Sequence, residues 1–127
     1  MLELYGFKNY HHIVHQTALI VDDEIEICQL LTSYLTKKNI KSFYSLTLKD
    51  ALEKCEKLLP EIIFLDNNLP DGSGISYIPK FMELNPSCKI IVISAMTNLT
   101  SKALSSGAAG FVSKPISFQN VESFIKE

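Results

Sequence analysis

The chain has 127 residues, 46% of them hydrophobic and 20% charged, and a formal net charge of −2. This size and balance predict one globular domain that is large enough to build its own core. The weak negative charge gives no broad attraction to nucleic acid or to anionic membranes, and no apolar run is long enough to span a bilayer. We therefore expect a cytoplasmic protein that binds neither of them directly.

The start of the chain differs from the rest, so we divide the sequence into a leader, 1–16, and a domain, 17–127. The leader lacks a basic segment followed by an apolar block, which argues against a secretory signal. His11 and His15 have the i, i+4 spacing of a helical metal pair, but no thiol or nearby carboxylate completes a site there. Three cysteines without close spacing are expected to be reduced thiols: Cys28, Cys55 and Cys88.

The apolar pattern of the first half alternates between strands and helices. Residues 18–21 are all apolar and predict a buried strand that ends at Asp22. Residues 40–44 predict a second strand, and the segment between the two has the apolar repeat of a helix that lies on a core. The inward side chains of this helix are expected to be Ile27, Leu30, Leu31, Tyr34 and Leu35.

A second helix is predicted to begin at Thr47, because Asp50 three residues later completes a capping-box pattern. Pro60 ends this helix, and the apolar run 62–65 then predicts a third strand that ends at Asp66. The expected buried stripe of the helix is Leu48, Ala51, Leu52, Cys55 and Leu59.

A turn-rich loop at 67–74 leads to a third helix over 76–84. Pro79 fits this helix only in the first turn, where its missing N–H is not needed. The apolar run 90–93 then predicts a fourth strand that ends at Ser94.

The last two helices flank a fifth predicted strand at 109–112. The first of them, over 97–106, is rich in Ser and Thr and has few apolar side chains to bury, chiefly Leu99, Ala103 and Leu104. The last is expected to be capped by Ser117. Its inward side chains are expected to be Phe118, Val121 and Ile125.

Five strand–helix repeats with unbroken apolar strands are typical of a parallel sheet that is covered by helices on both faces. Right-handed crossovers between such units give a doubly wound sheet. In this architecture ligands bind beyond the carboxyl ends of the strands. The predicted fold class is therefore α/β, with a five-stranded parallel sheet and a site at that edge.

Charged and polar side chains are predicted to converge at this edge of the sheet. They are Asp22, Asp23 and Glu24 after the first strand, Asp66 after the third, Ser94 after the fourth and Lys114 after the fifth. Carboxylates this close repel one another in a desolvated crevice unless a cation neutralises them. Oxygen ligands without a large dedicated cage favour Mg²⁺ over Ca²⁺.

Four stretches of the sequence resemble the receiver domains of bacterial two-component response regulators. They are LIVDDE at 19–24, IIFLDNNLPDGSG at 62–74, IVISAM at 91–96 and GFVSKP at 110–115. The resemblance implies a flavodoxin-like fold with strand order 2-1-3-4-5. It also implies a phosphoacceptor module for two-component signal transduction, which is not itself an enzyme.

By this resemblance, Asp66 accepts the phosphoryl group and holds Mg²⁺ with Asp22 or Asp23, or with both of them, one through water. The backbone carbonyl of Asn68 would be a further metal ligand. Lys114 would pair first with Asp66 and then with the phosphoryl oxygens. Elementary chemistry supports these roles, because a carboxylate can attack phosphorus when the charge on the transferred group is neutralised.

The resemblance also implies a switch, in which the Ser94 hydroxyl moves to the phosphoryl group and the Phe111 ring follows it. The surface they would control comprises the fourth helix, the fifth strand and the last helix. The implied partners are a histidine kinase or phosphotransfer protein, an output domain that acts in transcription regulation, and a second copy in a phosphorylation-dependent homodimer. We expect either a stand-alone receiver or a receiver cut from a longer regulator.

Two residues depart from the family pattern, and one peptide bond matches a special feature of it. Asn68 stands where many relatives carry a hydrophobic residue, and Phe111 lacks the hydroxyl of the Tyr often found there, so the phosphoryl lifetime is the property most affected. Lys114-Pro115 matches a peptide bond that is cis in the family.

Two other functions are compatible with the same fold. A flavin-binding electron carrier would need a Ser/Thr/Gly phosphate loop after the first strand, where Asp22, Asp23 and Glu24 would repel phosphate. A pseudo-receiver that binds partners without phosphorylation is disfavoured, because all the required residues are present.

Overall fold

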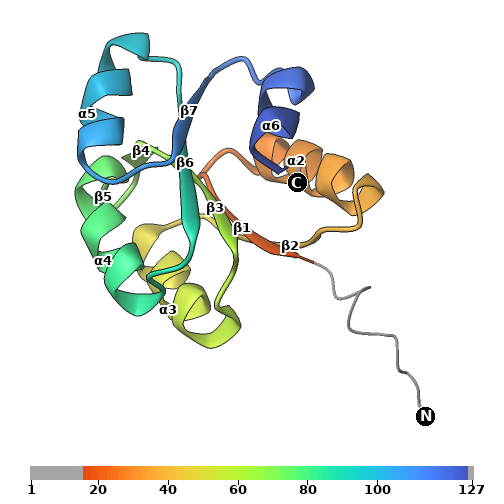
Figure 1. Cartoon of the computed structure of the whole chain (residues 1–127), viewed down its shortest axis with the longest axis horizontal. Coiled ribbons are helices and arrows are strands. Elements are labelled where there is room, and N and C mark those ends of the chain that lie inside the picture. The colour runs from red at the N-terminus through yellow and green to blue at the C-terminus, as the bar shows by residue number, and fades with distance from the viewer. Residues whose placement is uncertain (1–15, 126–127) are drawn as a thin grey trace.

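The computed structural model describes residues 16–125, so the predicted leader, apart from Gln16, and its histidines lie outside the described residues. Five parallel strands form one sheet in the order β2-β1-β3-β6-β7, which confirms the expected order 2-1-3-4-5 (Figure 1). The strands are β1 (Thr17–Val21), β2 (Lys41–Ser45), β3 (Ile62–Asp66), β6 (Lys89–Ser94) and β7 (Gly110–Ser113).

Helices cover both faces of this sheet (Figure 1). One face carries α2 (Ile25–Lys37) and α6 (Phe118–Ile125). The other face carries α3 (Leu48–Leu58), α4 (Ile78–Leu84) and α5 (Thr100–Ser105). The predicted α/β class with helices on both faces is therefore confirmed.

The sheet separates two hydrophobic cores, because successive side chains of a strand point to opposite faces. On β1, Leu19 and Val21 pack in the core under α3, α4 and α5, whereas Ala18 and Ile20 pack in the core under α2 and α6. All five residues of β3 are buried. Burial on both faces explains why the central strands are unbroken apolar runs in the sequence.

Two of the predicted signals for helix starts are realised in the structure. The Thr47 hydroxyl accepts a hydrogen bond from the Asp50 backbone N–H at 3.1 Å, as the capping pattern predicts. Pro79 lies in the first turn of α4. A 3₁₀ turn, Ile75–Tyr77, precedes this helix and leads the chain into it from the loop.

Four apolar side chains that were predicted to be buried are exposed, so those predictions are wrong. They are Leu30, Leu59, Leu104 and Phe118, with 43%, 55%, 48% and 39% of their surfaces accessible. On α2 the buried row is Cys28, Leu31 and Leu35, and Leu30 falls to its side. A helix has 3.6 residues per turn, so a stripe of apolar residues is wider than the row that can contact the sheet. The sequence pattern alone therefore does not show which residues at the margin of the stripe are buried.

The other exposed side chains have local causes. The α3 helix ends at Leu58, and Leu59 has a left-handed backbone conformation with φ of 47°, so its side chain leaves the helical stripe. The Phe118 ring stacks on Tyr34 of α2, with 4.4 Å between ring centroids, near the molecular surface. On α5 it is Ala103 that turns inward, which leaves the neighbouring Leu104 exposed.

The loop after β3 contains a small hairpin that the sequence did not predict. Two short strands, β4 (Asn68–Leu69) and β5 (Gly72–Ser73), pair antiparallel beside the main sheet. Each has only two residues, which is too short for any apolar alternation to be recognised.

Candidate functional site

Parallel pairing brings the predicted site residues together at one edge of the sheet. Asp66 ends β3 and lies in register with Ile93 of β6, so Ser94 and Asp66 end neighbouring strands. Asp22 follows β1 directly, and its backbone N–H donates to the carbonyl of Ser45 on β2 at 3.1 Å. The carboxyl ends of parallel strands therefore supply the site, as expected for this architecture.

Three carboxylates form the centre of the site. Single oxygens of Asp22, Asp23 and Asp66 all lie within 4.8 Å of one another. Asp22 and Asp66 are buried, whereas Asp23 is exposed. The structure thus brings together the three acidic residues that the sequence assigned to one site.

Lys114 brings a positive charge to these carboxylates. Its ammonium Nζ lies 3.1 Å from Asp22 Oδ2, 3.2 Å from Asp66 Oδ1 and 3.3 Å from Glu24 Oε1. The backbone N–H of Lys114 donates to the Ser94 carbonyl at 3.0 Å, which holds this residue at the strand end. The Lys114-Pro115 peptide bond is cis, as the resemblance implies.

Burial and like charges make the carboxylates costly to ionise. Desolvation, followed by the charge of Asp22, raises the pKa of Asp66 to about 6, although Lys114 opposes the shift. Desolvation also raises the pKa of Asp22, against the hydrogen bond from the Glu24 backbone N–H. For Lys114, burial would lower the pKa, but the hydrogen bond to Asp22 and the charges of Asp66 and Asp22 raise it above its usual value.

The donor set fits a hard divalent cation. Asp22 Oδ2 is buried, and the Lys114 ammonium lies 3.1 Å from it. One ammonium shared among several clustered carboxylates leaves the site with an excess of negative charge, which a divalent cation would neutralise. Mg²⁺ prefers oxygen ligands and usually keeps several water molecules beside one or two carboxylates.

The hairpin after β3 is braced by Asn67, a residue that sequence reasoning missed. Its carbonyl accepts from the Gly74 N–H at 2.9 Å. Its Oδ1 accepts from the Ser73 hydroxyl at 2.7 Å and from the Ile75 N–H at 3.0 Å. These contacts fix the chain between Asp66 and Asn68, and an Asn before a Gly-rich turn is the signal that could have suggested them.

Gly74 permits a close approach of this hairpin to the end of β3. A Cβ atom at position 74 would lie 2.1 Å from the Asp66 backbone oxygen, which no side chain tolerates. The glycine is therefore needed for the backbone to pack against the strand end that carries Asp66.

Ser94 and Phe111 lie on the adjacent strands β6 and β7. Ser94 is buried, and its Oγ accepts a hydrogen bond from the Met96 N–H at 3.0 Å. Phe111 pairs in register with Val92 and is partly buried against the core under α5. Ser94 thus lies at the end of the strand next to Asp66, and Phe111 lies on the following strand against the core.

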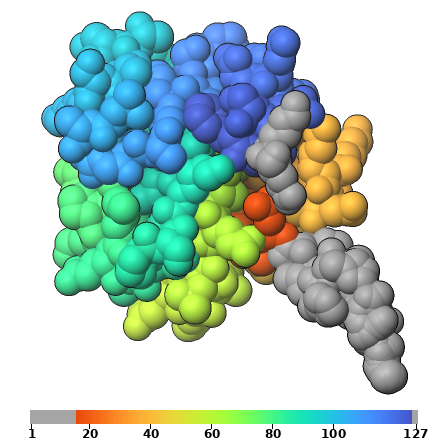
Figure 2. All heavy atoms as spheres, viewed as in Figure 1, coloured from red at the N-terminus to blue at the C-terminus, as the bar shows by residue number. Residues whose placement is uncertain are grey.

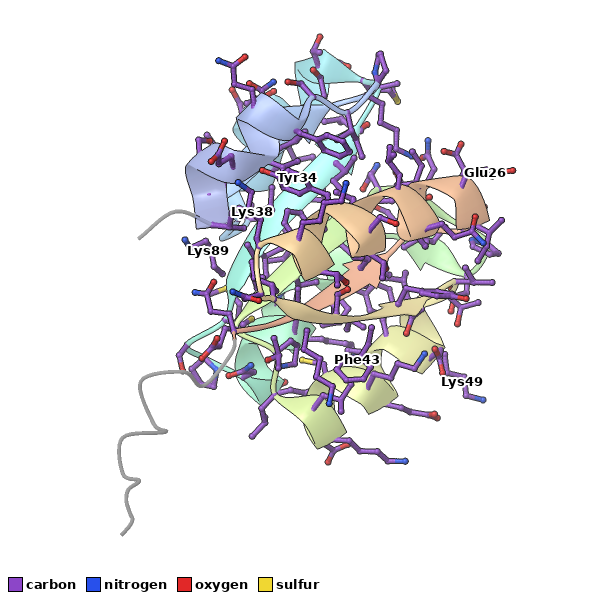
Figure 3. The ribbon with its side chains drawn as sticks, turned by 90° about the vertical axis from the view of Figure 1, so that its right-hand side faces the viewer. Glu26, Tyr34, Lys38, Phe43, Lys49 and Lys89 are labelled. Atoms are coloured by element: carbon purple, nitrogen blue, oxygen red, sulfur yellow. The ribbon has the colours of Figure 1, made fainter. Side chains whose placement is uncertain are left out.

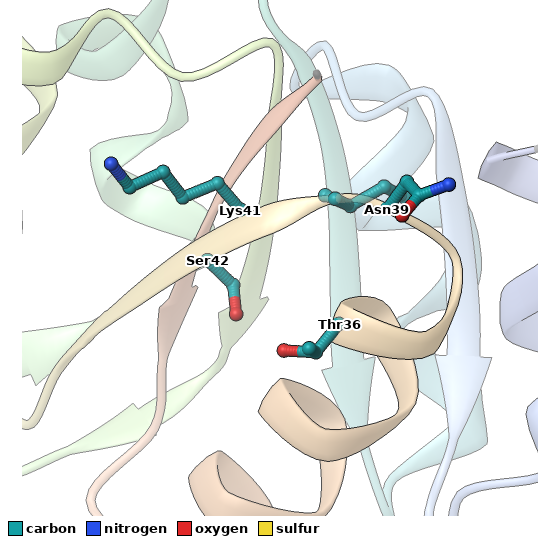
Figure 4. A pocket seen from close by; sticks show the side chains of 5 residues that line it. Thr36, Asn39, Lys41 and Ser42 are labelled. Atoms are coloured by element: carbon teal, nitrogen blue, oxygen red, sulfur yellow. The ribbon is translucent and has the colours of Figure 1, made fainter.

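A cavity lies at the opposite edge of the sheet and is separate from this site. Its volume is about 340 Å³, and it is lined by Thr36, Asn39, Ile40, Lys41 and Ser42. These residues join the end of α2 to the start of β2, and Figure 4 shows the Thr36 and Ser42 hydroxyls turned toward each other. None of the predicted site residues lines this cavity.

The family of the chain follows from comparison with known proteins. The model of the response regulator receiver domain family matches residues 18–126. The chain belongs to this family. Receiver domains are signalling modules of two-component systems, and the acidic pocket of the family, which binds Mg²⁺, corresponds to the cluster described above.

Individual relatives agree with this assignment. The receiver is 35% identical over 101 residues to the chemotaxis protein CheY of Thermotoga maritima, covering 77% of this chain and 84% of that protein. It is 32% identical over 111 residues to the KDP operon transcriptional regulatory protein KdpE of Escherichia coli, covering 86% of this chain and 49% of that protein. The beryllofluoride-activated NtrC4 receiver domain dimer superposes with a TM-score of 0.81 and 32% identity, covering 87% of this chain and 93% of that chain.

Several of the relatives are much longer than the receiver. The chain covers only 26% of a protein-glutamate methylesterase/protein-glutamine glutaminase of Maricaulis maris and 47% of the transcriptional regulatory protein CitB of Klebsiella pneumoniae. The similarity to these proteins is therefore confined to part of their length. Within residues 16–125, no helix is long and apolar enough to cross a membrane.

Proposed function

We propose that this receiver accepts a phosphoryl group on Asp66 from a histidine kinase or phosphotransfer protein and changes its surface in response. The observation that carries the proposal is the arrangement around Asp66. A buried carboxylate at a strand end lies beside the Lys114 ammonium at 3.2 Å and within one cluster with Asp22 and Asp23.

In the transfer step, an oxygen of the Asp66 carboxylate attacks phosphorus in line with the leaving group. The new O–P bond forms as the bond from phosphorus to the donor nitrogen or oxygen breaks, and the donor keeps that electron pair. Lys114 neutralises charge on the equatorial oxygens throughout. The burial of Asp66 excludes bulk water, which strengthens this electrostatic stabilisation.

Asp22, Asp23 and Asp66 would hold Mg²⁺, with the backbone carbonyl of Asn68 as a further ligand. The bound ion would neutralise charge on the phosphoryl oxygens and reduce repulsion among the carboxylates. The closeness of the three carboxylates, whose oxygens lie within 4.8 Å of one another, supports this assignment. Asn67 supports it too, because its hydrogen bonds hold the segment that presents the Asn68 carbonyl.

Ser94 and Phe111 would convert the phosphoryl group into a surface change. Ser94 Oγ would leave the Met96 N–H, and its hydroxyl would donate a hydrogen bond to a phosphoryl oxygen. The Phe111 ring would follow into the vacated space and alter the face formed by α5, β7 and α6.

This face would bind an output domain or partner, or a second phosphorylated copy in a homodimer. The beryllofluoride-activated NtrC4 receiver domain is a dimer, which supports dimerisation as a response. KdpE and CitB are transcriptional regulatory proteins, which supports transcription regulation as an output. The receiver itself would act in the cytoplasm as a signalling module without an enzymatic activity toward other substrates.

The test is incubation of the chain with a small acyl phosphate and Mg²⁺, followed by intact mass measurement. We expect one phosphoryl increment that requires Mg²⁺, is labile in alkali and disappears in Asp66→Ala. A phosphorylated Asp66→Ala protein, or a linkage that survives alkali, would show that the acceptor is a different side chain.

A further inference from the structure

Lys114 contacts one carboxylate more than the proposed phosphoryl transfer requires. Its ammonium lies 3.3 Å from Glu24 Oε1, in addition to its contacts with Asp22 and Asp66. Glu24 is the exposed member of the three, with 57% of its side chain accessible, against 0% for Asp22 and 7% for Asp66. The proposed function gives Glu24 no role.

The backbone holds Glu24 in a defined place between the site and α2. Its N–H donates to Asp22 Oδ1 at 2.8 Å, and its carbonyl accepts from the N–H groups of Ile27 and Cys28 at 3.0 and 3.2 Å. Glu24 is thus the N-cap residue of α2, but its side chain makes no capping hydrogen bond. The carboxylate is directed to Lys114 instead of to the helix.

Three carboxylates match the three N–H donors of one ammonium. A phosphoryl group on Asp66 adds charged oxygens that need the same donors, so an existing contact must be released. Release of Asp22 is costly, because its carboxylate is fully buried and water cannot replace the contact. Release of Glu24 costs least, because water can solvate its exposed carboxylate.

We propose that Glu24 is a positioning residue that holds Lys114 in the resting site and opposes its transfer to the phosphoryl group. The proposal rests on the proposed function, in which Lys114 pairs with phosphoryl oxygens. Glu24 thereby stabilises the unphosphorylated receiver and lowers the affinity of the site for a phosphoryl group. Loss of its charge favours the phosphorylated state, because Glu24 then no longer competes with the phosphoryl oxygens for Lys114.

The test compares the chain with Glu24→Gln in a titration with beryllofluoride, a phosphoryl mimic, followed by backbone amide NMR shifts. Saturating Mg²⁺ removes the separate effect that a lost negative charge has on metal binding. We expect Glu24→Gln to bind beryllofluoride roughly two- to fivefold more tightly, the range that one exposed ion pair supports. The gain should shrink as ionic strength rises, because exposed pairs are screened by salt.

Glu26→Gln is the matched control. Glu26 lies in the first turn of α2 and points outward (Figure 3), and it makes no ion pair with any described residue. Its substitution removes the same charge close by and should change the affinity by less than about twofold. In a Lys114→Ala background, Glu24→Gln should lose its effect, because it acts through the lysine.

Three results would overturn the assignment of Glu24. They are a gain no larger than that of Glu26→Gln, weaker binding, or a gain that persists in full without Lys114, which would mean direct repulsion of the phosphoryl group. A parent chain that does not bind beryllofluoride at all would contradict the proposed function, and this proposal with it.

Discussion

At the Asp66 side chain, burial and the charge of Asp22 raise the pKa to about 6, well above the ordinary value of 3.8. The folded protein therefore binds the Asp66 proton more tightly than the unfolded chain does. Below about pH 4, Asp66 is protonated in both states and does not lower the free energy of unfolding. The loss of stability develops as pH rises from about 4 to 6 and is complete above that range. A shift of this size corresponds to at most about 3 kcal/mol of lost stability in the metal-free protein.

We predict how the difference in unfolding free energy between Asp66→Asn and the parent chain depends on pH when a chelator is present. The unfolding free energy of the variant, relative to that of the parent, should rise between pH 4 and pH 7, because Asn has no charge to bury. Urea unfolding at several pH values measures this difference. A difference that does not change with pH would mean that folding does not raise the pKa of Asp66.

At the scale of elements, Asp71 joins the hairpin after β3 to the start of α3. Its carboxylate oxygens accept from the Leu48 and Lys49 N–H groups at 2.9 and 3.0 Å. Asp71 lies more than twenty residues away along the chain, yet it satisfies two amides that the first turn of α3 leaves unpaired. The charge also interacts favourably with the positive end of the helix.

We expect Asp71→Ala to lower the melting temperature by a few degrees, because the two amides lose their acceptor. Asp71→Asn should recover part of the loss, since its amide oxygen can still accept one hydrogen bond. Glu53→Ala is the control, because Glu53 is exposed on the same helix. Equal effects of Asp71→Ala and Glu53→Ala on thermal unfolding would show that the cap contributes nothing specific.

The α5 helix is the element best suited to change its packing. It has six residues, of which only Ala103 is fully buried, and it forms one flank of the molecule next to α4 (Figure 2). Few buried contacts give a small free-energy gap between alternative arrangements. A difference of about 1.4 kcal/mol shifts such an equilibrium tenfold, which is within reach of one charge-assisted hydrogen bond.

Beryllofluoride with Mg²⁺ should therefore change amide hydrogen exchange over residues 97–112. Ser94→Ala should still bind the mimic but lose most of this response, because the hydroxyl that leaves Met96 for the phosphoryl group is absent. Ser101→Ala, which alters an exposed hydroxyl on α5, should keep the response. If Ser94→Ala responds like the parent chain, the signal leaves Asp66 by another route.

For the molecule as a whole, the sequence predicted the fold because the parallel strands are buried on both faces. Runs such as 62–65 and 90–93 are unbroken and apolar, and parallel topology places their carboxyl ends at one edge. The same topology allowed Asp22, Asp66 and Lys114 to be assigned to one site from positions far apart in the chain. In the structure Lys114 lies 3.1 Å from Asp22 and 3.2 Å from Asp66.

Other features depend on contacts that no local pattern specifies. The Lys114–Glu24 pair spans ninety residues, and the Asp71 cap joins a turn to a distant helix. The exposure of Leu30 depends on how α2 is rotated about its own axis on the sheet. A hydrophobic stripe in the sequence fixes this rotation only approximately. Such details follow from packing, and sequence periodicity alone does not determine them.

The central claim is that Asp66, and neither Asp22 nor Asp23, carries the phosphoryl group. Borohydride reduces an acyl phosphate to an alcohol and so marks the modified residue permanently. After treatment with an acyl phosphate and Mg²⁺, then borohydride and trypsin, fragment masses should place the mark at Asp66 within the peptide 58–80. A mark at Asp22 or Asp23, or at Asp71 in the same peptide, would contradict the account of this site.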